Sequence, residues 1–139
     1  MKRTSLLGGL ALLAASSLPA SAAAISDVAG NWKDPDTGAI LAFADCGGDL
    51  CASIAKAATP GMKDDQNPDQ AKRAAPLEGL AILTHAKKSD DASWKGDLYN
   101  SKDGKTYSGY VTLLAPDKLQ LKGCALVVFC KSLTLAKVP

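Results

Sequence analysis

Hydrophobic and polar residues alternate along much of the chain, which is the pattern of a β-strand with one buried face. The alternation is clearest at residues 118–122, Lys-Leu-Gln-Leu-Lys, where both leucines face one side and the polar side chains face the other. Seven other short segments are also expected to form strands. These segments are residues 30–33, 39–44, 50–56, 79–85, 93–99, 107–114 and 131–138.

Residues that favour turns separate the expected strands. They occur as Asp-Pro-Asp-Thr-Gly at 34–38, Gly-Gly-Asp at 47–49, Lys-Asp-Gly at 102–104 and Pro-Asp at 116–117. The apolar residues show no long helical period. The sequence therefore predicts an all-β domain of about eight strands, either a small antiparallel up-and-down barrel or a sandwich.

One long segment, residues 57–76, interrupts this rhythm. It contains three prolines, many polar residues and no hydrophobic period. A loop of this length within a compact domain is usually either functional or disordered. Two interpretations follow: a binding loop, or a segment that is disordered or merely covers one end of the domain.

The first 22 residues have the features of an export signal. Two basic residues at positions 2 and 3 precede an apolar run at 6–15, and Ala20-Ser21-Ala22 forms an A-x-A cleavage signature. The run is shorter than the ~20 residues that a transmembrane helix needs. We expect cleavage after Ala22, or alternatively after Ala24. Residues 23–139 would then form one periplasmic or secreted domain with no integral membrane segment.

The charge balance argues against a nucleic-acid partner. The chain has 16 Lys and Arg against 14 Asp and Glu, and removal of the signal takes two basic residues, which leaves 14 of each sign. Nucleic-acid binders normally have a basic patch, and proteins that bind anionic membranes normally have a polybasic run. Neither occurs as a contiguous stretch of this sequence.

The four cysteines predict two disulfides, because they are even in number and follow an export signal. Cys46 and Cys51 bracket a tight turn and are expected to face each other across a hairpin. Cys124 and Cys130 would lie ~20 Å apart in one extended strand, so they can bond only if the chain turns back between them. Local pairing is favoured over bonds that cross between the pairs. The spacing and the oxidising compartment disfavour a zinc site.

Residue types that carry catalysis are sparse. His85 is the single histidine, and no nucleophile elbow, phosphate-binding loop or dinucleotide fingerprint occurs. Residues 65–69, Asp-Gln-Asn-Pro-Asp, begin like a calcium-binding loop, but Gln70 and Pro76 stand where that loop requires glycine and glutamate. These side chains are expected to shape a turn, so no metal or cofactor is predicted.

Several short motifs resemble those of a known family. They are Gly30-Asn31-Trp32, Cys46-Gly47-Gly48, Asp65-Gln66-Asn67-Pro68, Trp94-Lys95-Gly96-Asp97-Leu98-Tyr99-Asn100, Asp103-Gly104-Lys105-Thr106-Tyr107 and Leu121-Lys122-Gly123-Cys124. In order and spacing they resemble the exported bacterial family called domain of unknown function 2147, over nearly all of the mature chain. That family has no settled activity, so the resemblance bears on fold more than on function.

Gly-x-Trp in the first expected strand also resembles the lipocalin-like barrels, whose tryptophan plugs one end of the barrel beside the last strand. The resemblance implies an up-and-down barrel that is filled by side chains or holds one small ligand, with Trp32 as a core plug. The pattern of the domain of unknown function 2147 family commonly ends in Trp-x-Arg, where this chain has Leu135-Ala136-Lys137. Lys137 would then replace the arginine against Trp32, with a weaker contact because lysine lacks the flat guanidinium.

Three functions remain open. The first is non-catalytic binding, by a monomer, of a small apolar or amphipathic ligand or of an envelope component. The second is protein interaction, for example inhibition of a secreted enzyme, and the third is carboxylate-based hydrolysis. An apolar cavity would favour the first, a filled barrel with an exposed apolar patch the second, and convergent carboxylates in a cleft the third.

The expected binding residues lie on the long loop and on the hairpin that follows it. Arg73 would meet an anionic group of the ligand. For the two tyrosines beside the turn at 103–104, the alternative is a cross-strand aromatic pair that supports the sheet. The candidates are Asp65, Asn67, Arg73, Trp94, Tyr99 and Tyr107.

Overall fold

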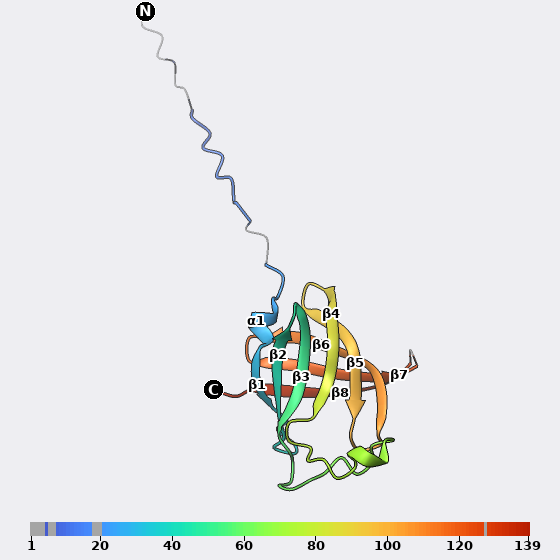
Figure 1. Ribbon diagram of the computed structural model, residues 1–139. Coiled ribbons are helices and arrows are strands. Elements are labelled where there is room, and N and C mark those ends of the chain that lie inside the picture. Colours follow the sequence, from blue (N-terminus) through green and yellow to red (C-terminus); the bar gives the residue numbers. More distant parts are fainter. Residues whose placement is uncertain (1–4, 6–7, 18–20, 127) are drawn as a thin grey trace, which may run out of the picture.

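The computed structural model describes residues 5, 8–17, 21–126 and 128–139. Eight antiparallel strands follow one another in chain order and close into a barrel (Figure 1). A short helix, α1 (Ile25–Val28), precedes them, and one turn of 3-10 helix, η1 (Gln70–Lys72), lies between the third and fourth strands. The strands are β1 Gly30–Lys33, β2 Ile40–Cys46, β3 Asp49–Lys56, β4 Ala81–Asp90, β5 Ser93–Asn100, β6 Lys105–Ala115, β7 Lys118–Ala125 and β8 Phe129–Lys137. The all-β prediction is confirmed, and the barrel is the arrangement that forms.

Inward-facing residues of neighbouring strands meet in register in the barrel core. The register aligns Trp94 of β5, Val111 of β6 and Leu121 of β7, and all three are buried. In β7 the leucines of the alternating segment, Leu119 and Leu121, are buried, and Leu119 pairs with buried Leu135 of β8. The period of two in the sequence is therefore the inside–outside alternation of the barrel wall.

A row of glycines lets adjacent strands of the barrel wall approach each other closely. Gly96, Gly109 and Gly123 are register partners on β5, β6 and β7. A Cβ atom on Gly96 would lie 2.7 Å from the Cα of Ala86, and one on Gly109 would lie 2.6 Å from the Cβ of Leu98. Neighbouring strands and side chains thus occupy the space that larger residues would need.

Trp32 and α1 close one end of the barrel. Trp32 is fully buried, and its indole N–H donates to the carbonyl of Val28, with an N···O distance of 2.7 Å. Trp32 pairs with Lys137 of β8, whose ammonium lies 5.0 Å from the indole centroid. The two residues therefore stand as the lipocalin-like resemblance implies, with Lys137 over Trp32.

Both disulfides are local. Cys124 and Cys130 are direct partners in the β7–β8 ladder, with Cα atoms 4.1 Å apart, because the chain turns back between them. Cys46 and Cys51 are also bonded, but they do not face each other: Cys46 pairs with Asp49 and Cys51 with Ala44. The expected opposition was wrong because the turn uses only Gly47 and Gly48, both with positive φ, so the bond runs diagonally.

Residues 8–17 contain neither helix nor strand and extend away from the barrel (Figure 1). The basic positions 2 and 3 and Ala20 of the expected cleavage signature lie outside the described residues. The first tie to the barrel after the expected cleavage point is at Ala23, whose N–H donates to the carbonyl of Asp91 at 2.7 Å. In the described part of the chain, no helix is long and apolar enough to cross a membrane.

Candidate functional site

The long loop between β3 and β4 is an ordered lid at the end of the barrel opposite α1 (Figure 1). Its two arms run antiparallel: the Asp64 N–H donates to the Ala75 carbonyl and the Leu77 N–H to the Met62 carbonyl, both at 2.9 Å. Leu77 is buried and belongs to the barrel core. The segment is therefore an ordered lid and not a disordered loop.

Asp64 anchors the lid to the barrel wall. The residue is fully buried, and its two carboxylate oxygens accept hydrogen bonds of 2.7 Å from the Tyr99 hydroxyl of β5 and from the Asn67 amide. Burial of the ring, the hydrogen bond to Asp64 and the negative charges of Asp64 and Asp103 raise the pKa of Tyr99 to about 12. Tyr99 is thus a neutral donor, and its hydrogen bond supplies a partner for the buried Asp64 carboxylate.

The polar residues that follow Asp64 hold the lid in shape. The Asn67 side-chain oxygen accepts from the Asp69 N–H at 2.9 Å, and Asp69 accepts from the Ala71 N–H at 3.1 Å at the start of η1. Arg73 donates from Nε to the Asn67 carbonyl at 2.7 Å. The turn-shaping interpretation of this segment therefore describes what these side chains do. Arg73 is engaged within the loop.

The lid also contacts the turn between β5 and β6. Gly104 of that turn has φ +69°, and a Cβ atom there would overlap the carbonyl oxygen of Gln66. Both the backbone conformation and the close approach require glycine. In the same turn, the Tyr107 hydroxyl donates to Asp103, which lowers the pKa of the Asp103 carboxyl and raises that of Tyr107.

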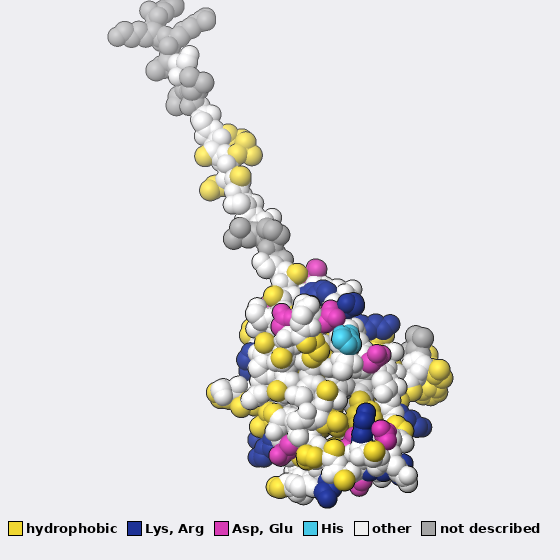
Figure 2. Space-filling model, in the orientation of Figure 1, with side chains coloured by type: hydrophobic (Ala, Val, Ile, Leu, Met, Phe, Trp, Pro, Cys, Tyr) yellow, Lys and Arg dark blue, Asp and Glu magenta, His cyan; other side chains and the backbone are white. Residues whose placement is uncertain are grey.

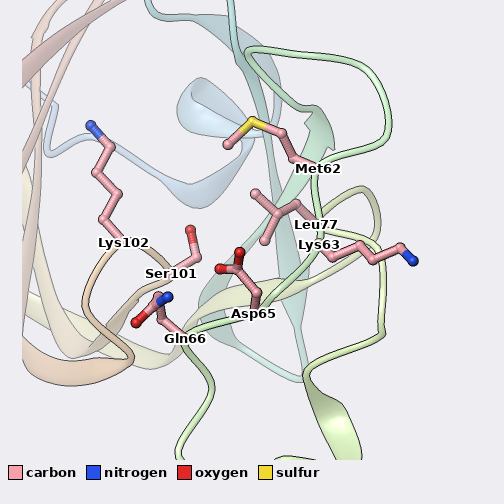
Figure 3. Close-up of a pocket in the computed structure, with 7 residues that line it drawn as sticks. All are labelled: Met62, Lys63, Asp65, Gln66, Leu77, Ser101 and Lys102. Atoms are coloured by element: carbon pink, nitrogen blue, oxygen red, sulfur yellow. The ribbon is translucent and has the colours of Figure 1, made fainter.

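A hollow of about 310 Å³ lies between the lid and this turn. Leu77 and Met62 supply an apolar wall, and the Asp65 carboxylate points toward Ser101 (Figure 3). The ammonium of Lys63 extends away from the other lining groups (Figure 3). The full lining is Met62, Lys63, Asp65, Gln66, Leu77, Ser101 and Lys102. The hollow therefore combines an apolar surface with a carboxylate, an amide, a hydroxyl and the side chains of two lysines, which suits a small amphipathic molecule.

The structure brings only one of the six candidate binding residues, Asp65, to this hollow. Trp94 is 2% exposed in the barrel core, with the Lys88 ammonium 4.0 Å from its ring centroid, and it does not line the hollow. The alternative of a cross-strand tyrosine pair does not fit the register. The register pairs Tyr99 with Thr106 and Tyr107 with Leu98, so the two rings face opposite sides of the hairpin.

The sequence reasoning missed Asp64 and most of the lining. Asp64 and Asp65 are adjacent acidic residues, and the period of a strand-like arm puts one inside and the other in solvent. Leu77, a hydrophobic residue directly after the polar segment, is the signal that could have shown where the lid packs. Among the described residues, no cluster of three His, Cys, Asp or Glu side chains could hold a metal ion.

Taken together, the fold is a closed eight-stranded antiparallel barrel with a helical plug at one end and a lid at the other. The chain belongs to the bacterial family described as "Uncharacterized protein conserved in bacteria (DUF2147)", whose profile matches residues 30–137. Protein HP1028 from Helicobacter pylori, described as belonging to the lipocalin family, has a similar structure. The TM-score is 0.71 at 22% identity, over 80% of this chain and 82% of that chain. The similarity concerns the fold. No curated protein matches the chain.

Proposed function

We propose that this protein is an exported, non-catalytic, monomeric binding protein that takes a small amphipathic ligand into the hollow beneath its lid. The observation that carries the proposal is the lining of that hollow. Met62 and Leu77 would contact the apolar part of the ligand. Asp65 and Ser101 would meet a head group that donates hydrogen bonds, such as an amine or a hydroxyl.

The site is assigned to the lid end because there the β3–β4 loop and the β5–β6 turn together line a hollow that combines apolar and polar side chains. The other end of the barrel is closed by the fully buried Trp32. The hydrolase alternative needs a second free carboxylate beside Asp65. Its neighbour Asp64 is buried and already bonded to Tyr99 and Asn67, which supports binding over catalysis.

Export with cleavage after Ala22 is part of the same proposal. The contacts of the barrel begin at Ala23, whose N–H meets Asp91 and whose carbonyl accepts from Lys88. Cleavage after Ala24 would remove these contacts. The two disulfides suit an oxidising compartment.

The proposal is tested by an NMR titration of ¹⁵N-labelled protein with octylamine and, separately, with octanoate. We expect octylamine to shift the amide signals of Met62, Leu77 and Ser101. Octanoate should bind more weakly, because the Asp65 carboxylate repels it while the ammonium groups of Lys63 and Lys102 extend away from Asp65 (Figure 3). Met62→Trp should fill the hollow and abolish the shifts. The control Leu114→Trp, at a leucine 49% exposed outside the lining, should keep them. Shifts that survive Met62→Trp, or that never appear, would reject this site.

The exposed apolar tip of the β7–β8 hairpin favours a second function, docking to another surface. A filled barrel with such a patch is what the protein-interaction alternative requires. The side chains at this tip determine which kind of surface it can bind.

A further inference from the structure

The β7–β8 hairpin presents exposed hydrophobic side chains at its tip. Leu126, Val128 and Phe129 are 79%, 77% and 69% exposed. Pairing of β7 with β6 stops at Cys124 and Ser108, although β6 itself begins earlier, at Lys105. The hairpin therefore leaves the barrel wall and projects beyond it. Figure 2 shows hydrophobic atoms protruding at that edge of the molecule, where Figure 1 draws the end of β7.

The turn keeps a leucine at a position that suits other residues better. Leu126 has φ +55°, a left-handed conformation that glycine and asparagine adopt with little strain and leucine does not. The disulfide between Cys124 and Cys130 crosses the base of the tip and ties its two strands together. The local backbone thus bears a cost to display an apolar side chain, on a hairpin that is covalently fixed.

The charge of the same hairpin differs from that of the rest of the domain. From residue 118 to residue 139 the chain has four lysines and no acidic residue. Residues 23–117 carry the other 10 basic residues of the mature domain and all 14 acidic ones. These lysines are spaced along two strands, so they form no polybasic run in the sequence. The fold places two of them, Lys122 and Lys131, next to the disulfide: Lys122 pairs with Ser132 and Lys131 with Gly123.

We propose that this hairpin docks the protein onto an anionic lipid bilayer. Leu126, Val128 and Phe129 would enter the interfacial region, while Lys122 and Lys131 would meet the lipid phosphates. A protruding apolar tip fits a deformable lipid surface, whereas a protein partner would need a matching concave pocket. The net negative charge of the remaining barrel would turn the hairpin toward an anionic membrane. Lid and hairpin tip use different residues, so this inference does not depend on the ligand site.

The test is co-sedimentation with lipid vesicles of pure phosphatidylcholine and of an equal mixture of phosphatidylcholine and phosphatidylglycerol. Exposed leader residues such as Leu12 would also bind lipid, so all variants must have one N-terminus, verified by intact mass. We expect Val128→Ser with Phe129→Ser to weaken binding to the mixed vesicles about tenfold or more. Lys131→Gln should weaken it about fivefold. The control Leu114→Ser, at an exposed leucine outside the hairpin, should not change it.

Binding that falls with added salt and with the loss of the apolar tip would support the proposal. The absence of binding to mixed vesicles, equal binding to both kinds of vesicle, or an equal effect of Leu114→Ser would overturn it. A wild-type dimer that the tip variant dissociates, without vesicle binding, would also overturn it by showing that a second copy covers the tip. If the double variant fails to fold, Lys131→Gln still tests the proposal, because it changes an exposed side chain and should leave the fold intact.

Discussion

The hydrogen bond between Tyr99 and Asp64 should stabilise the folded protein by about 2 kcal/mol. Tyr99→Phe removes the hydroxyl and leaves the fully buried Asp64 carboxylate with the Asn67 amide. A hydrogen bond to a charged group contributes about 1.5–3 kcal/mol. Burial first, and then the hydrogen bond to Asp64, raise the Tyr99 pKa from 10.0 to about 12, so the pH at which this contribution is lost can be measured.

The sign of the pH dependence follows from the direction of the shift. Because the folded protein holds the Tyr99 proton more tightly than the unfolded chain does, its contribution is fully present below pH 10. It declines as the pH rises from 10 through about 12, where the folded protein also loses the proton. The difference in unfolding free energy between wild type and Tyr99→Phe should therefore shrink over this interval.

The assay is urea unfolding of both proteins at pH 7 and at several pH values between about 10 and 12. Tyr110→Phe is the control, since that tyrosine packs beside Lys122 on the barrel wall and lies outside the lid. A loss below about 0.5 kcal/mol at pH 7, a loss equal to that of Tyr110→Phe, or a difference that is constant up to pH 12 would refute the reasoning.

Four further predictions test the fold and the lid. Trp32→Ala should cost ~3–5 kcal/mol in urea unfolding, as for a large buried aromatic; a stable variant would show that Trp32 is not a core plug. Cys46→Ser should cost about 2 kcal/mol, and peptide mapping of the wild type should recover Cys46 linked to Cys51, not to Cys124 or Cys130. Gly104→Ala should cost more than Gly47→Ala, because both have positive φ but only Gly104 abuts another chain segment; equal melting temperatures would contradict this. Arg73→Ala should cost under ~0.5 kcal/mol and leave octylamine binding intact, since its contact is within the exposed loop; lost binding in the titration would return Arg73 to the site.

The strands were predictable from the sequence because each has one buried face. Alternation at residues 118–122 and the turn residues between strands depend on local chemistry alone, and β7 forms there as expected. Trp32 was also interpretable, because its motif is shared with barrels of known architecture. These signals did not distinguish a closed barrel from a sandwich. It depends on the pairing of β1 with β8, which are separated by most of the chain.

The candidate site was less predictable because it depends on register and on long-range contact. Tyr99 and Tyr107 lie on opposite faces because the turn from residue 101 to 104 sets the pairing of Asn100 with Lys105, and a shift by one residue would reverse this. Nothing local distinguishes buried Asp64 from exposed Asp65, since burial follows from how the lid lies on β5. Trp94 was a candidate binding residue because aromatic side chains occur both in hydrophobic cores and in binding sites.

Native mass spectrometry of the oxidised protein, purified without detergent from its producing cells, shows directly whether the lid hollow holds a ligand. We expect a retained small molecule on the wild type and on Leu114→Trp, and its absence on Met62→Trp, in which the hollow is filled. A wild-type protein that carries no ligand and binds neither octylamine nor octanoate would rule out a ligand site beneath the lid, as would a ligand that remains bound to Met62→Trp.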